Sequence, residues 1–169
     1  MVKAIQVGLG HWGFSWTKEV IPKVPNIHMV GYVDSSPEAT KRVQSELGIE
    51  EKRCFHSLDE AAQGVEADLA ICTLRTEAHY PVVKRCLELG FNVLVEKPFA
   101  STIAQAKELV ELARLQNDRR AILRVDHIRN REPVLKGMLI VKRSRIKEIH
   151  GRSPSDDEKD LIERRYSAT

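Results

Sequence analysis

The sequence predicts a doubly wound α/β fold, in which helices cover both faces of a parallel sheet. Short apolar runs alternate with amphipathic helical segments over residues 1–126, which is the pattern of repeated strand-helix-strand units. A glycine-rich turn separates the first apolar run from the first helical segment, as in parallel sheets that bind a ligand at their carboxyl edge. With 42% apolar residues in a chain of 169, one such core can be buried.

The first strand-helix-strand unit and the helix after it carry clear boundary signals. The apolar run 4–7 predicts the first strand, and prolines end a helix predicted over 14–23. The run 27–33 predicts the second strand. A helix over 37–47 then begins with Pro37, which suits a first helical position, and is followed by a glycine.

The rest of the predicted domain repeats this pattern. Capping boxes at 57–60 and 102–105 open two helices. Apolar residues at helical spacing predict another helix over 77–89, closed by Gly90. The remaining apolar runs predict strands, the last two being counted as the fifth and sixth of the sheet: 68–73, 92–95 and 121–125.

The turn Gly8-Leu9-Gly10-His11-Trp12-Gly13 carries the main functional signal. Gly8 permits a tight turn, Gly10 lets a pyrophosphate approach the backbone, and Gly13 lets the helix pack close to the strand. Asp34 follows Gly13 by 21 residues, at the end of the second predicted strand, where an acid that binds a ribose is expected. Together these residues predict a dinucleotide-binding Rossmann fold, with the phosphates at a helix N-terminus.

Asp34 predicts NAD as the cofactor in preference to NADP. Its carboxylate would accept hydrogen bonds from the adenosine ribose and would repel a 2′-phosphate. The neighbouring Ser35 supplies no positive charge. Lys41 and Arg42, one turn into the next helix, could partly offset that repulsion. The alternative is that Asp34 only ends a strand before the next helix begins.

Glu96-Lys97-Pro98 follows the fifth predicted strand, at the sheet edge where ligands bind in such folds. An ammonium group there could hydrogen-bond a substrate hydroxyl and stabilise charge that develops on it. The spacing alone fits equally well a solvated Lys97 in a turn before proline.

The segments GLGHWG, TEAHYPVVKRCLELGFNVLVEKP and DHIRNREP, together with Asp34, resemble the Gfo/Idh/MocA oxidoreductases over most of residues 3–150. The resemblance implies an NAD(P)-dependent dehydrogenase acting on a sugar, a polyol or a related compound, with Lys97 as the catalytic residue beside substrate and nicotinamide. It also implies that further residues line the cofactor: Cys72, Thr73, Leu74, Arg75, His79 and Glu96. The chain departs from the family at Leu74-Arg75, where Thr-Pro is usual.

Members of that family continue into a second domain, which supplies most of the substrate pocket and the Asp and His used in proton transfer. Residues 1–126 are accordingly predicted to be the NAD(P)-binding domain, and 127–169 the truncated start of the C-terminal substrate and oligomerisation domain. His127 is the nearby candidate for a base, although a structural hydrogen-bonding role is favoured. The alternative function is a dinucleotide-binding protein without turnover, either a sensor or a truncated remnant.

Composition argues against several other classes of protein. Three cysteines with no C-x-x-C spacing predict neither a disulfide framework nor a metal site. With no secretory leader and no apolar stretch of membrane-spanning length, a cytoplasmic protein without a membrane partner is expected. Residues 119–152 contain eleven Lys or Arg against three Asp or Glu but no aromatic residue for base stacking, so no nucleic-acid partner is expected. A homo-oligomer is expected, because a dimer could cover apolar surface that a missing second domain would leave exposed.

Overall fold

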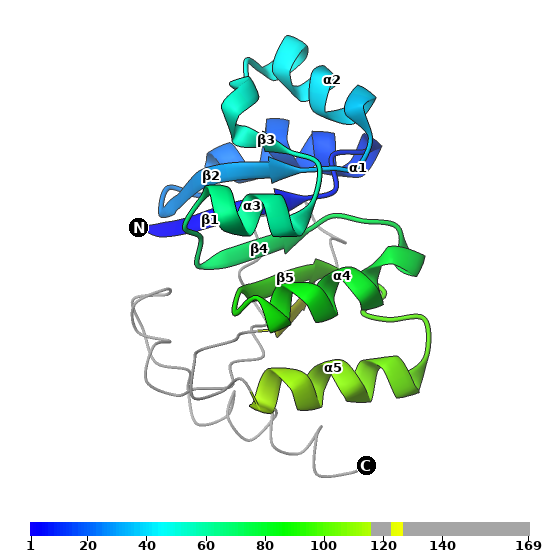
Figure 1. Cartoon of the computed structure of the whole chain (residues 1–169). Coiled ribbons are helices and arrows are strands. Elements are labelled where there is room, and N and C mark those ends of the chain that lie inside the picture. Colours follow the sequence, from blue (N-terminus) through cyan, green and yellow to red (C-terminus); the bar gives the residue numbers. More distant parts are fainter. Residues whose placement is uncertain (116–122, 127–169) are drawn as a thin grey trace.

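The computed structural model describes residues 1–115 and 123–126, which form a six-stranded parallel sheet with helices on both faces (Figure 1). The strands are β1 (Val2–Val7), β2 (Ile27–Val33), β3 (Cys54–Phe55), β4 (Leu69–Cys72), β5 (Asn92–Glu96) and β6 (Leu123–Asp126). The main helices are α1 (His11–Ser15), α2 (Pro37–Leu47), α3 (Leu58–Gly64), α4 (Thr76–Glu88) and α5 (Ile103–Leu115). The doubly wound Rossmann fold predicted from the sequence is confirmed.

The strand order is β3-β2-β1-β4-β5-β6, so the winding of the chain reverses between β1 and β4. In open α/β sheets, such a reversal opens a crevice for ligands at the carboxyl ends of the strands. The register aligns those ends: Val7 pairs with Val33 on one side and with Cys72 on the other, and Cys72 pairs with Val95. The ends of four strands therefore form one row across the sheet.

Each face of the sheet has its own apolar layer. Helices α3, α4 and α5 pack on one face through a cluster that includes Val83, Leu87 and Leu109, and Figure 1 shows α3 and α4 in front of the strands, with α5 beside α4. Helices α1 and α2 pack on the other face through a second cluster that includes Phe14 and Val43. On this second face, α1 and α2 therefore cover the part of the sheet near β1 and β2, next to the glycine turn that joins β1 to α1.

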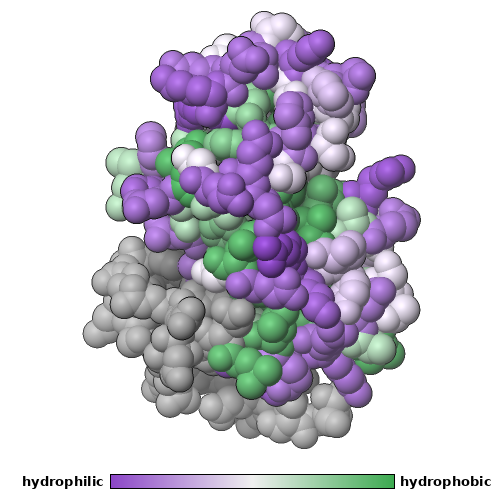
Figure 2. Space-filling model, viewed as in Figure 1, coloured by the Kyte–Doolittle hydropathy of each residue, from purple (hydrophilic) through white to green (hydrophobic). Residues whose placement is uncertain are grey.

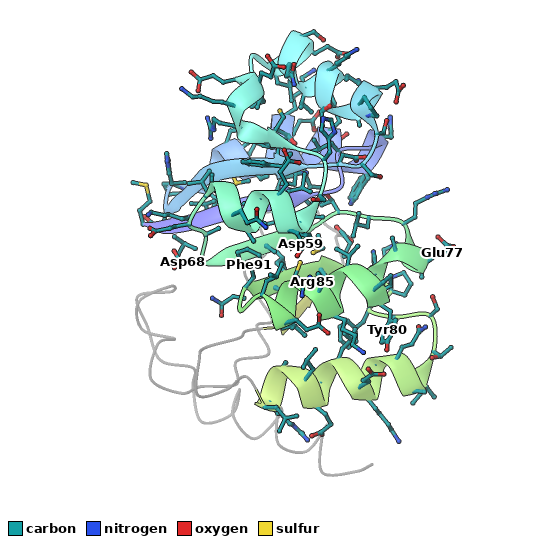
Figure 3. All side chains as sticks on the ribbon, in the orientation of Figure 1. Asp59, Asp68, Glu77, Tyr80, Arg85 and Phe91 are labelled. Atoms are coloured by element: carbon teal, nitrogen blue, oxygen red, sulfur yellow. The ribbon has the colours of Figure 1, made fainter. Side chains whose placement is uncertain are left out.

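Polar side chains connect the helices of the first layer. Arg85 of α4 donates to Asp59 of α3, and Tyr80 of α4 donates to Glu108 of α5 at 2.7 Å, as Figure 3 shows for Arg85 beside Asp59 and for Tyr80 turned towards α5. The surface over these helices is mainly hydrophilic, with apolar side chains visible between them (Figure 2). Because an exposed ion pair contributes at most about 1 kcal/mol, apolar packing supplies most of the stability of this layer.

Most helix boundaries match the sequence signals. Gly48 follows α2 with a left-handed φ of 68°, and Ser57 Oγ accepts from the backbone of Glu60 at the start of α3. The Glu60 carboxylate reaches the amide of His56, one residue before the cap, and the box at 102–105 makes the corresponding contacts. No described helix combines the length and apolar character needed to cross a bilayer.

Two elements differ from the sequence prediction. The helical stretch predicted over 14–23 begins earlier, at His11, and continues after α1 as a π-helical turn, Trp16–Val20, and a 3₁₀ turn, Ile21–Lys23. Pro22 lies inside that last turn, because proline is tolerated in the first positions of a helical turn. Strand β3 has two residues and so leaves no apolar run to detect. The predicted second-domain segment, 127–169, and its candidate base His127 lie outside the described residues.

Candidate dinucleotide site

The predicted site segments follow the row of paired residues at the carboxyl edge of the sheet. One position beyond that row lie Gly8 after β1, Asp34 after β2, Thr73 after β4, and Glu96 as the last residue of β5. Parallel strands bring their carboxyl ends to the same edge. The structure therefore gathers these segments in one place, and their contacts with a cofactor stay predictions.

The three motif glycines meet different constraints. Gly8 has a φ of +93°, and a Cβ there would lie 2.7 Å from the Thr73 carbonyl oxygen, while a Cβ on Gly13 would lie 1.9 Å from the Gly8 carbonyl oxygen. Gly10 has an ordinary φ of −58° and no atom within 4 Å of a Cβ position. It caps α1 without a side-chain hydrogen bond, so the first helical amides stay available to an external acceptor. This open helix start fits a pyrophosphate group.

A buried polar network supports the turn from inside the domain. Gln6 is fully buried, and its Nε2 donates to the Gly13 carbonyl at 2.7 Å and to Thr73 Oγ1 at 3.1 Å. Its Oε1 accepts from Thr17 Oγ1 at 2.6 Å, and Thr73 Oγ1 donates to the Gly8 carbonyl at 2.7 Å. Sequence reasoning missed Gln6 and Thr17. The available signal was a glutamine inside an otherwise apolar strand run.

Asp34 is bound to the backbone through both carboxylate oxygens. Oδ2 accepts from the Leu9 amide at 2.7 Å, and Oδ1 accepts from the Ser36 amide at 2.9 Å. The Ser36 hydroxyl donates to Glu38 at 2.7 Å, and this hydrogen bond lowers the pKa of Glu38. The carboxylates of Asp34 and Glu38 thus both hydrogen-bond to Ser36, while Ser35 is exposed.

Arg42, which the sequence analysis names as a possible counter-charge to Asp34, contacts two other side chains. Its guanidinium lies 3.9 Å from the centroid of the Phe14 ring, and its Nε donates to Glu46 at 3.0 Å. A cation held by an aromatic ring and a carboxylate must give up both contacts before it can bind a phosphate elsewhere. Arg42 is therefore not a free counter-charge to Asp34, whereas the charge of Lys41 contributes to lowering the pKa of Glu38.

Glu96 connects the glycine turn to the segment that carries Lys97. Its side chain is 6% exposed, with Oε1 accepting from the Trp12 indole at 3.1 Å and Oε2 from the Lys97 amide at 3.2 Å. The Lys97 side chain itself is exposed at the same edge. Its ammonium is therefore accessible to a ligand, as the sequence prediction requires.

His79 ties two loops together beneath this edge. It is 1% exposed, with Nδ1 at 2.6 Å from the Pro98 carbonyl oxygen and Nε2 at 3.1 Å from that of Leu74. A neutral imidazole has one N–H and donates to one of the two oxygens at a time. His79 thus joins the segment after β4 to the segment after Lys97, and its predicted contact with the cofactor stays a prediction.

The other predicted residues divide by exposure. Cys72 is buried, and the hydrogen bond with the Cys86 thiol together with burial raises the pKa of Cys72, which keeps it a thiol at neutral pH. The Leu9 side chain is also buried, so only its backbone reaches the edge. His11 and Arg75 are exposed. Among the described residues, no three His, Cys, Asp or Glu side chains are grouped to hold a metal ion.

Comparison with known proteins agrees with this geometry. The profile of a family described as "Oxidoreductase family, NAD-binding Rossmann fold" matches residues 2–125. The uncharacterized protein y4oX of Sinorhizobium fredii is 29% identical over 115 residues, which are 66% of this chain and 32% of that protein. The scyllo-inositol 2-dehydrogenase (NAD(+)) of Bacillus subtilis is 26% identical over 110 residues, 65% of this chain and 32% of that protein.

A solved structure extends the likeness to the fold. Scyllo-inositol dehydrogenase from Lactobacillus casei, crystallised with bound NAD(H) and scyllo-inositol, aligns with a TM-score of 0.64 at 20% identity, over 74% of this chain and 36% of that one. The chain thus spans about a third of the length of each of these three proteins.

Proposed function

Because the chain belongs to the Gfo/Idh/MocA family of NAD-binding oxidoreductases, we propose that it acts as a dehydrogenase, which oxidises or reduces a sugar, a polyol or a related compound. The observation that carries the proposal is the uncapped helix start at Gly10, with open space above it and a carboxylate, Asp34, on the neighbouring strand end. The scyllo-inositol dehydrogenases among the similar proteins support a polyol as the substrate class.

Each part of the edge has a role in this proposal. The amides after Gly10 would hold the pyrophosphate and Asp34 the adenosine ribose. A bound nicotinamide would supply the hydride acceptor or donor. The exposed ammonium of Lys97 would hydrogen-bond the substrate oxygen and stabilise negative charge on it.

We further propose that NAD is preferred to NADP. A 2′-phosphate on the adenosine ribose would meet Asp34 and Glu38, which flank Ser36. Arg42 would have to leave Phe14 and Glu46 to compensate. A phosphate and a carboxylate a few ångströms apart repel each other even in water, and more strongly where solvent is partly excluded.

Glu38→Gln tests that electrostatic argument. The variant should bind NADPH about threefold to tenfold more tightly, the effect of removing one charge at roughly 6 Å in water from a phosphate that carries between one and two negative charges, and should bind NADH as the parent chain does. Isothermal titration at low and high salt measures both affinities, and the gain should shrink as salt screens the charge.

The matched control is Glu66→Gln, which removes the same charge just before β4, at the opposite edge, where Glu66 pairs with Lys3. It should change neither affinity. An equal gain in both variants would assign the effect to net charge and not to Glu38.

A second function, dinucleotide binding without turnover, is favoured by one observation. The ring nitrogens of His79 both face backbone carbonyls, so this buried imidazole is not free to take a proton from a substrate hydroxyl. His79 therefore does not supply Lys97 with a side chain that could accept the substrate proton.

Titration with NADH, NADPH and ADP-ribose, followed by assays over a panel of sugars and polyols, separates the functions. Micromolar binding of NADH with turnover of one panel member is the expected result for a dehydrogenase. Binding without turnover supports the second function. If none of the three ligands binds, both functions are overturned.

A further inference from the structure

Trp12 is an exposed indole at the ligand edge. It is the second residue of α1 and keeps 46% of its surface exposed, whereas Trp16, one turn later, is 5% exposed and packs in the core. The sequence alone allows both tryptophans either to pack near the cofactor or to lie on a helix face buried against its neighbours. The structure separates them, since only Trp16 is buried.

The indole of Trp12 is held by a specific hydrogen bond. Its Nε1 donates to Glu96 Oε1 at 3.1 Å, and the second oxygen of that carboxylate accepts from the Lys97 amide at 3.2 Å. Glu96 is 6% exposed, and a buried carboxylate is costly unless its oxygens are hydrogen-bonded. Trp12 is the side chain that provides one of these bonds, and through Glu96 it is linked to the backbone of Lys97.

The topology sets where the ring lies. Strands β1 and β5 are not neighbours, because β4 runs between them. A side chain that starts just after β1 and reaches the end of β5 therefore passes over the carboxyl end of β4. The ring bridges the phosphate-binding turn and Lys97, which is the path that the nicotinamide half of a dinucleotide would follow.

We propose that Trp12 is a positioning residue for the nicotinamide half of the cofactor: its N–H fixes Glu96 and the start of the Lys97 segment, and its exposed face contacts the nicotinamide riboside. This inference rests on the proposed dinucleotide function. Burying the exposed half of an indole is favourable, and a ligand lying along the edge supplies the surface that covers it.

Comparison of NADH with ADP-ribose, which lacks the nicotinamide ring, tests the proposal in the full chain. Trp12→Phe keeps an aromatic ring but removes the donor to Glu96. The variant should lose about tenfold in NADH affinity, because Glu96 and the Lys97 segment are no longer held in place for the nicotinamide half, and less than about twofold in ADP-ribose affinity. Trp16→Phe is the matched control, since its ring does not reach the edge, and it should not change the ratio of the two affinities.

Fluorescence gives a second readout, which a purely structural role would not change. The chain has two tryptophans, so Trp16→Phe leaves Trp12 as the sole indole. Saturating NAD⁺ should shield Trp12 from quenching by acrylamide, and saturating ADP-ribose should shield it much less.

The outcomes separate the two proposals. If Trp12→Phe weakens NADH and ADP-ribose equally, or weakens neither, Trp12 does not position the nicotinamide half and the inference is overturned. Equal shielding by both ligands overturns the contact with the exposed ring. If the parent chain binds neither ligand, the proposed dinucleotide function itself fails.

Discussion

Gly13→Ala should destabilise the domain by about 3 kcal/mol or more and abolish NADH binding. A Cβ at this position would lie 1.9 Å from the Gly8 carbonyl oxygen and 2.9 Å from the Thr73 hydroxyl oxygen. The first contact is with backbone that is itself fixed between β1 and α1, so it cannot be relieved by a side-chain rotation. Thermal unfolding followed by circular dichroism measures the loss of stability, and calorimetric titration with NADH measures the loss of binding.

Gly10→Ala is the matched control, because the same methyl group enters open space. Its Cβ would have no atom within 4 Å, so the melting temperature should stay within about 2 °C of the parent value. The methyl group would nevertheless occupy the place where the backbone should approach the pyrophosphate, and NADH affinity should fall at least about tenfold. Parent-like NADH binding by Gly10→Ala would show that the phosphates do not lie against this turn.

Gln6→Leu should lower the free energy of unfolding by about 2–4 kcal/mol, although leucine fills a similar volume. The substitution removes the buried hydrogen bonds that Gln6 makes with the Gly13 carbonyl, the Thr73 hydroxyl and the Thr17 hydroxyl. Thr17 Oγ1 still donates to the Gly13 carbonyl at 3.0 Å, so the expected cost is that of these three lost bonds, each worth about 1 kcal/mol. Urea unfolding of the variant and the parent chain measures the difference.

Thr17→Val provides the control for that measurement, because it removes one hydroxyl from the same network. Alone it should cost about 1–2 kcal/mol. Combined with Gln6→Leu it should cost less than the sum of the two single losses, since the two side chains share a hydrogen bond. Strict additivity would mean that Gln6 and Thr17 act independently and that no network supports the turn.

The sequence predicts the parts of the fold that depend on local signals. Alternating apolar runs located five of the strands, and the glycines at 48 and 90 marked helix ends correctly because a left-handed φ is cheap only for glycine. The end of the first helical stretch at residue 23 agrees with the prediction, whereas its start at His11 and its division into α1, a π-helical turn and a 3₁₀ turn that contains Pro22 were not predicted. Strand β3 was not predicted, because a strand of two residues is too short to show an alternation of apolar and polar residues.

The contacts between the segments of the site could not be predicted from the sequence, because they join residues far apart in the chain. Trp12 meets Glu96 and His79 meets Pro98 only after the strands are in register. Arg42 appeared as a free cation one turn into a helix, and its contact with Phe14 depends on how α1 and α2 pack together. The sequence shows that such side chains can form hydrogen bonds or ring contacts, while the topology determines which partner each one meets.

The shortness of β3 has a consequence for how copies of this chain can meet. It lies at one edge of the sheet, and only Cys54 and Phe55 pair with β2. An edge strand of two residues offers too few unpaired backbone groups to recruit a strand from another molecule. This border is thereby protected against sheet-to-sheet extension and the aggregation that follows from it, so an association of two copies at this edge has to use side-chain surfaces in place of a ladder built outward from β3.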